Sequence, residues 1–148
     1  MDQGNTAFVL ISAALVLLMT PGLAFFYGGM VKAKSVVSMM MLSFGSLGLI
    51  AVLWVLYGYA ISFSNGGTDT FVGIDGWFGI DTSFLGLNAQ VADAAKPAGA
   101  YPTLAFVAFQ ATFAIITVAL ISGAIADRAK FGAWMVFAGL WATIVYFP

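Results

Sequence analysis

The stretch from Tyr101 to Arg128 reads YPTLAFVAFQATFAIITVALISGAIADR and decides the class of this protein. No charge interrupts its first 26 or so residues, more than the roughly 20 that a helix needs to cross a bilayer core. The first charged side chains are those of Asp127 and Arg128 at its end. The stretch therefore predicts a transmembrane helix.

The overall composition predicts the same class. The chain has 148 residues, of which 62% are hydrophobic and 7% charged, whereas a soluble domain has about 25% charged residues. A water-exposed surface cannot be built from so few charges, so we expect an integral membrane protein. The net charge of −1 and the lack of a basic patch argue against nucleic-acid binding. The absence of Cys and His removes the usual metal ligands, and we expect no cofactor.

Four uncharged runs predict four membrane spans, at about residues 6–31, 35–63, 101–126 and 131–148, with an outer loop at about 64–100. Helices satisfy their backbone hydrogen bonds internally, as a lipid environment requires. The predicted fold class is therefore all-α, a polytopic transmembrane helix bundle.

The basic residues predict the orientation. One side of the predicted bundle carries four of them and the other side one: Lys32, Lys34, Arg128 and Lys130 against Lys96. Because cytoplasmic loops are enriched in Lys and Arg, we expect the two short loops in the cytoplasm and the N-terminus outside. Residues 64–100 then form an outer loop, which we expect to be partly ordered on the membrane surface.

The chemistry available inside the spans is neutral. No ionisable group for a proton relay occurs between the span ends, and no phosphate loop, zinc motif or nucleophile elbow is present. We therefore expect no enzyme activity. The fourth run stops at Pro148 without a polar flank, so we expect the chain to be the N-terminal part of a larger protein.

Aromatic side chains are the remaining candidates for a site. Phe106, Phe109 and Phe113 fall at i, i+3 and i+7 of the predicted helix, with Gln110 and Thr112 beside them. Such a stripe serves packing or lipid contact, or it lines a path for a small solute, since aromatic faces attract cations. Tyr27 is either an interface anchor or part of an internal polar contact.

Several motifs resemble the ammonium transporter family (Amt/Mep, related to the Rh proteins). They occur in the order of that family and cover nearly the whole chain except the outer loop: MTPGLAFFYGGMV at residues 19–31, WVLYGY at 54–59, FQATFAIIT at 109–117 and GAIADR at 123–128.

The resemblance implies eleven spans, an outside N-terminus and a homotrimer in the cell membrane, with a narrow hydrophobic pore for ammonium or ammonia in each subunit. It implies that Phe113 is the phenylalanine gate and that Phe109 lies in the outer vestibule, with Gln110 and Tyr27 as structural support. A cytoplasmic PII-type regulator is a further implied partner. The tryptophan, acidic residue and serine of the family's recruitment site and its two pore histidines lie beyond the equivalent of Pro148.

Two alternatives to transport remain open at this point. One is an ammonium-sensing membrane domain coupled to a signalling module. The other is an inactive truncated remnant. The reading frame after Pro148 distinguishes the sensor, which would carry a kinase or cyclase region.

Overall fold

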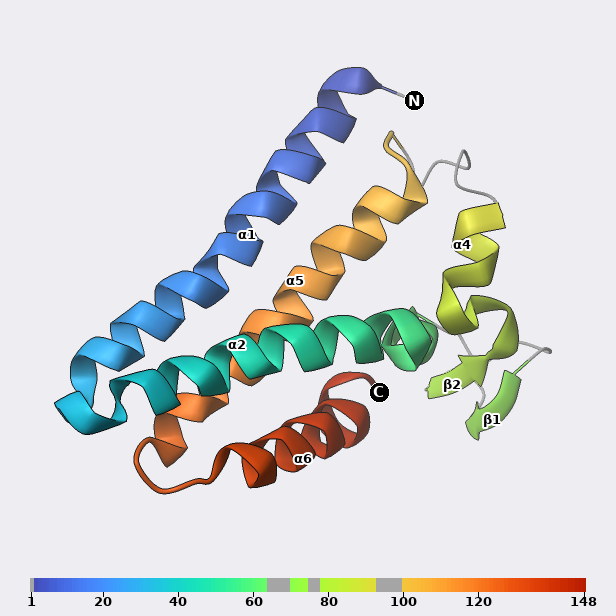
Figure 1. Ribbon diagram of the computed structural model, residues 1–148. Helices are drawn as coiled ribbons and strands as arrows, with labels where there is room; N and C mark the ends of the chain where they lie inside the picture. The colour runs from blue at the N-terminus through green and yellow to red at the C-terminus, as the bar shows by residue number, and fades with distance from the viewer. Residues whose placement is uncertain (1, 64–69, 75–77, 93–99) are drawn as a thin grey trace.

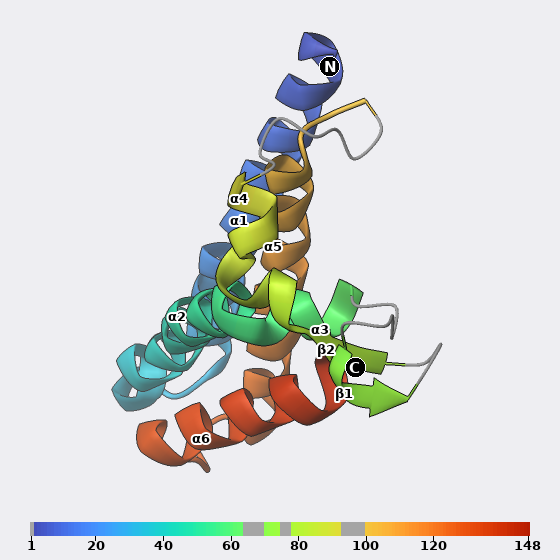
Figure 2. The same cartoon turned by 90° about the vertical axis from the view of Figure 1, so that its right-hand side faces the viewer.

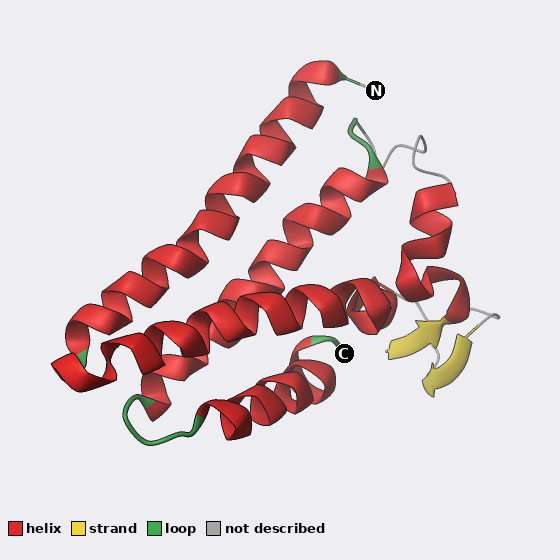
Figure 3. Cartoon of the chain, in the orientation of Figure 1, coloured by secondary structure: helices red, strands yellow, loops and turns green. Residues whose placement is uncertain are grey.

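The computed structural model describes residues 2–63, 70–74, 78–92 and 100–148, and these form a bundle of long apolar helices with a small hairpin at one side (Figures 1 and 3). The helices are α1 (Gln3–Met30), α2 (Val36–Leu53), α3 (Tyr59–Phe63), α4 (Asn88–Ala92), α5 (Thr103–Ile121) and α6 (Phe131–Trp141). The strands are β1 (Thr70–Ile74) and β2 (Phe78–Asp81).

Short 3₁₀ or π-helical turns extend three of the α-helices. A π-helical turn, Trp54–Gly58, joins α2 to α3, and a second one, Ala142–Tyr146, follows α6. A 3₁₀ turn, Ser122–Ile125, ends α5. With these extensions, three helical segments in the described part of the chain are long and apolar enough to cross a membrane: Gln3–Met30, Ala33–Phe63 and Thr103–Ile125. The fourth predicted span corresponds to a shorter apolar helix, Phe131–Tyr146.

The start of α1 is fixed by a local cap and by a link to a distant segment. The Asp2 side chain accepts a hydrogen bond from the Gly4 amide at 2.9 Å, as an N-cap residue does. The Asp2 amide donates to the carbonyl of Ala100 at 3.0 Å. The N-terminus is therefore held next to the segment that leads into α5.

α2 is the central helix, because it packs against α1, α5 and α6, while α1 also runs along α5 (Figure 1). Two buried tryptophans join these helices. Trp134 of α6 donates its indole N–H to the Leu42 carbonyl and the Ser46 hydroxyl of α2, both at 3.0 Å. Trp54 donates to the Val107 carbonyl of α5 at 3.3 Å. Buried indole N–H groups need such acceptors, so the two contacts set how the helices are rotated.

The two π-helical turns face each other. The Tyr57 and Thr143 hydroxyls lie 2.7 Å apart, and Thr143 also donates to the Gly139 carbonyl at 2.7 Å. Because the Thr143 proton is used there, Tyr57 donates to Thr143. Gly58 lies against the buried ring of Phe147, where an added Cβ would come within 2.8 Å of it. The ends of α2 and α6 are thus joined by a polar contact and a close apolar one.

Within the described residues, strands occur in the segment that we predicted to be an outer loop. β1 and β2 pair antiparallel, with Val72 opposite Ile80 and Ile74 opposite Phe78. β-branched and aromatic residues favour such pairing. α4 then lies against α5 (Figures 1 and 2), and Phe84 contacts Tyr59 with ring centroids 6.2 Å apart. Lys96, the one basic residue of this loop, lies outside the described residues.

Candidate functional site

α5 has one face that its neighbours cover and one that they leave open. Its buried residues include Thr112, Ile115 and Val118. On the other side, the exposed fraction is 38% for Phe113 and 50% for Leu120. These two residues lie seven apart, which is two helical turns, so they share one face. We call Phe109, Phe113, Thr117 and Leu120 the open face of α5.

The two phenylalanines of the open face contact each other. The Phe109 and Phe113 ring centroids are 5.0 Å apart with planes at 78°, an edge-to-face pair. Phe106, the third member of the predicted stripe, instead packs against Phe63 at 5.2 Å and Tyr101 at 6.5 Å. The stripe is therefore divided, because the Phe106 ring packs against residues outside α5, whereas Phe109 and Phe113 pack against each other.

The polar groups near this pair are mostly engaged with the helix itself. The Thr112 hydroxyl donates to the Phe109 carbonyl at 2.6 Å, and the Thr117 hydroxyl donates to the Phe113 carbonyl at 2.7 Å. Gln110 is half-buried, and its side chain makes no hydrogen bond with the described residues. A solute at the open face would therefore meet two aromatic rings, with the neutral carboxamide of Gln110 close by on the same helix.

Tyr27, near the end of α1, contacts the end of α5. Its hydroxyl donates to the Leu120 carbonyl at 3.0 Å. Gly123 leaves room for the ring, since an added Cβ would lie 2.6 Å from Tyr27 Cζ. A hollow of ≈ 310 Å³ opens beside this contact, lined in part by Met30, Met39 and Ala126.

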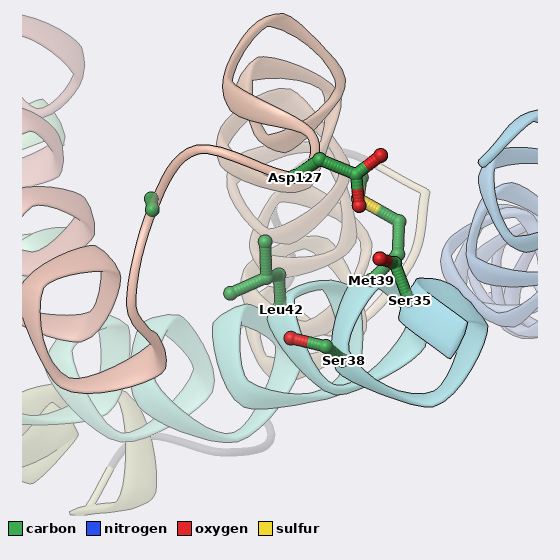
Figure 4. A pocket seen from close by; sticks show the side chains of 6 residues that line it. Ser35, Ser38, Met39, Leu42 and Asp127 are labelled. Carbon is green, nitrogen blue, oxygen red and sulfur yellow. The ribbon is translucent and has the colours of Figure 1, made fainter. Parts of the chain in front are cut away.

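A smaller, more polar pocket of ≈ 130 Å³ lies between the start of α2 and the loop after α5 (Figure 4). Ser35, Ser38 and Asp127 line it with Met39 and Leu42. Asp127 has a positive φ of 63°, which turns the chain sharply at this point. Phe113 is fourteen residues earlier in the chain, and this pocket shares no residue with the open face. The described residues contain no cluster of acidic or other ligating side chains suited to a metal.

The sequence patterns did not identify Thr117 and Leu120 as members of the open face. Their spacing from Phe113, four and seven residues, places them on that face of any helix. The missing information was which face the other helices leave uncovered. The sequence patterns likewise do not pair Tyr27 with Gly123, which lies 96 positions further along the chain.

Comparison with known proteins places these features in a family. The model of the Ammonium Transporter Family matches residues 7–148. An ammonium transporter of Mycobacterium tuberculosis is 56% identical over 99% of this chain and 32% of its own length. An ammonium transporter of Bacillus subtilis is 44% identical over 100% of this chain and 34% of its own length.

Solved structures give the same result. The crystal structure of Candida albicans Mep2 matches all of this chain with a TM-score of 0.81 and 26% identity, covering 30% of that protein. Saccharomyces cerevisiae Mep2 matches with a TM-score of 0.80 and 29% identity, covering 32% of that protein. The chain thus spans about a third of the length of the relatives it matches. The predicted all-α membrane bundle and the predicted family are confirmed: this chain is part of a multi-pass membrane protein and belongs to the Ammonium Transporter Family.

Proposed function

We propose that the complete protein carries ammonium, as ammonia, across the membrane, and that the open face of α5 forms part of the wall of its pore. The relatives with 56% and 44% identity are ammonium transporters, and they match almost the whole of this chain. The observation that supports the location is the edge-to-face pair of Phe109 and Phe113, in which Phe109 is half-buried and Phe113 stays 38% exposed on the open face.

The chemistry of this face favours a neutral species next to the rings. No ionisable side chain occurs in α5, and an unpaired charge at the centre of a bilayer is costly. An ammonium ion can be held over an aromatic ring, with about 0.5–1 kcal/mol gained where the site is exposed and about 2 kcal/mol or more where it is desolvated. That gain does not offset complete loss of hydration. We therefore propose that ammonium is recruited at the aromatic side and that ammonia passes Phe113.

In this proposal Phe113 is the gate, Phe109 is a contact in the outer vestibule, and Gln110 and Tyr27 are structural supports. Phe113 lies ten residues after the start of α5 at Thr103, about 15 Å along the axis. That depth suits a constriction below an outer vestibule. Tyr27 acts at the other end of α5, where it fixes the approach of α1 through Leu120 and Gly123.

The same proposal covers the whole assembly. The spans are about residues 6–31, 35–63, 101–126 and 131–148, the first four of eleven, with the N-terminus outside. The complete protein forms a homotrimer, and its cytoplasmic side binds a PII-type regulator. Cross-linking in membranes tests this assembly. If the protein is a trimer, the largest cross-linked product should contain three subunits.

The experiment for the function is uptake of labelled methylammonium. The complete reading frame is expressed in cells that lack their own ammonium transporters, and unlabelled ammonium is added as a competitor. We expect saturable uptake above that of cells with an empty vector, and inhibition by ammonium. Expression in the membrane without any ammonium-sensitive uptake would contradict the proposal and favour a sensing or inactive protein.

A further inference from the structure

The π-helical turn after α6 contains one more residue than an α-helical turn would. Ala138 and Ala142 lie four apart on α6, and both are 0% exposed. A regular α-helix would bury Val145 or Tyr146 next. The structure instead buries Phe147, five positions after Ala142 and 1% exposed. The Phe147 amide donates to the Ala142 carbonyl at 2.9 Å, the five-residue step of a π-turn. The extra residue thus turns the Phe147 ring into the bundle.

Tyr57, in the π-helical turn after α2, contacts residues at both ends of the turn after α6. The two helices lie side by side (Figure 1). The Tyr57 hydroxyl donates to Thr143 Oγ1 at 2.7 Å, and the Tyr57 and Phe147 ring centroids are 5.9 Å apart with planes at 81°. Thr143 in turn donates to the Gly139 carbonyl at 2.7 Å, which fixes its rotamer on α6. Because Tyr57 touches both Thr143 and Phe147, its two contacts fit only one register of the chain between them.

Gly58 and Trp54 form the place that receives the Phe147 ring. An added Cβ on Gly58 would lie 2.8 Å from that ring. The Trp54 and Phe147 ring centroids are 5.7 Å apart. Trp54 also donates its indole N–H to the Val107 carbonyl of α5 at 3.3 Å. A change of register at the end of α6 would therefore take a contact away from the side chain that connects α2 with α5.

We infer that Tyr57 and Thr143 form a register lock, whose hydrogen bond selects a π-helical turn over an α-helical one at the end of α6. π-helical turns are rare and often occur at functional sites. With the lock closed, the chain leaves α6 in a direction rotated by about 100° from that of an uninterrupted α-helix. With the lock open, Phe147 turns away from Gly58. This inference does not depend on what the protein transports.

The test measures amide hydrogen exchange in the purified complete protein in neutral detergent, by mass spectrometry of peptides that cover residues 143–147. Tyr57→Phe removes the donated proton and keeps the ring. From the usual net strength of one hydrogen bond, exchange in these peptides should rise about 2- to 10-fold. Thr143→Val should act in the same direction, and Thr143→Ser, which keeps a hydroxyl, should stay near the wild type. Unchanged exchange in the Tyr57→Phe protein would overturn the inference.

Tyr27→Phe is the matched control. Tyr27 also donates one hydroxyl hydrogen bond between helices, to the Leu120 carbonyl at 3.0 Å. Its loss should raise exchange near Leu120 and leave residues 143–147 unchanged. An equal rise at 143–147 in the two tyrosine variants would show general loosening of the bundle, and the inference would then be wrong.

A second variant tests the register itself. Gly58→Ala places a methyl group where the π-helical register puts the Phe147 ring. Because overpacking a buried contact is destabilising, exchange at residues 143–147 should rise about fivefold or more. Gly48→Ala is the control on the neighbouring helix, since an added Cβ there has no atom within 4 Å. Equal exchange in the two alanine variants would show that the Phe147 ring lies elsewhere, as in an α-helical register, and would contradict the lock.

Discussion

At the scale of single residues, the ring of Tyr27 packs directly against Gly123. The Tyr27 ring is held by its hydrogen bond to Leu120, so it cannot swing away without losing an acceptor. A Cβ on Gly123 would lie 2.6 Å from Cζ and 2.8 Å from the hydroxyl oxygen of Tyr27. A glycine is therefore needed at position 123 because a larger side chain would clash with Tyr27, and not because the backbone conformation is unusual.

Gly123→Ala should destabilise the protein. Overpacking of a close contact costs about 1–3 kcal/mol, and thermal unfolding in detergent measures the change. Gly132→Ala is the matched control, because an added Cβ there has no atom within 4 Å. In a Tyr27→Ala background the cost of Gly123→Ala should fall to nearly that of the control. An equal cost in both backgrounds would show that the Tyr27 ring is not what Gly123 accommodates.

The site residues differ in how far the sequence predicts them. Phe109 and Phe113 are four apart, so any helix brings them onto one side, and the structure puts their rings in contact. The contact of Tyr27 with Leu120 and the contact of Trp134 with Leu42 join residues more than 90 positions apart. Those pairs depend on how each helix is rotated about its axis, which local spacing does not specify.

At the scale of helices, this rotation is hard to predict because the helices are apolar on all sides. α1 buries the small or hydroxyl residues Ala13, Thr20, Ala24 and Gly28 and leaves Phe8, Leu15 and Phe25 exposed. In a soluble protein the large apolar residues mark the buried face. Between membrane helices, small residues allow close approach, and large ones can face lipid. Hydrophobic periodicity therefore predicted that helices form but not which side packs.

The contact between α2 and α6 gives a matched pair of glycines on one helix. A Cβ on Gly45 would lie 2.7 Å from the ring of Phe131 and 2.9 Å from the sulfur of Met135, while one on Gly48 would have no atom within 4 Å. Gly45→Ala should lower the stability by about 1 kcal/mol, the low end for overpacking, because Phe131 is 41% exposed and has room to move. Gly48→Ala should be neutral or slightly stabilising. Equal melting temperatures for the two variants would show that α6 does not pack against Gly45.

At the scale of the whole molecule, the sequence predicts a helical membrane bundle, because charges are confined to the ends of long apolar runs. The outer loop was predicted less well. Its strands Thr70–Ile74 and Phe78–Asp81 are short, and the pairing of two short strands depends on a turn and on the surface beneath. The π-helical turns at Trp54–Gly58 and Ala142–Tyr146 were also not predicted, since they are helical by any local pattern.

The orientation in the membrane is a prediction of the charge distribution that labelling can test. The chain contains no cysteine, so Gln3→Cys and Lys34→Cys each introduce one here, with any cysteine elsewhere in the complete protein removed. Both positions are exposed. An impermeant maleimide added to intact cells should label the cysteine at position 3, and should label the one at position 34 only after permeabilisation. The reverse pattern would contradict an outside N-terminus.

The central claim is that the open face of α5 borders the path of the substrate. The most direct measurement compares methylammonium uptake by the complete protein with Phe113→Ala and with Phe106→Ala, each normalised to the amount of protein in the membrane. Phe113 lies on the open face, whereas Phe106 packs against Phe63 and Tyr101. The account predicts that Phe113→Ala changes the rate or the selectivity between methylammonium and ammonium, and that Phe106→Ala changes mainly protein stability. Unchanged uptake and selectivity in the Phe113→Ala protein would contradict it.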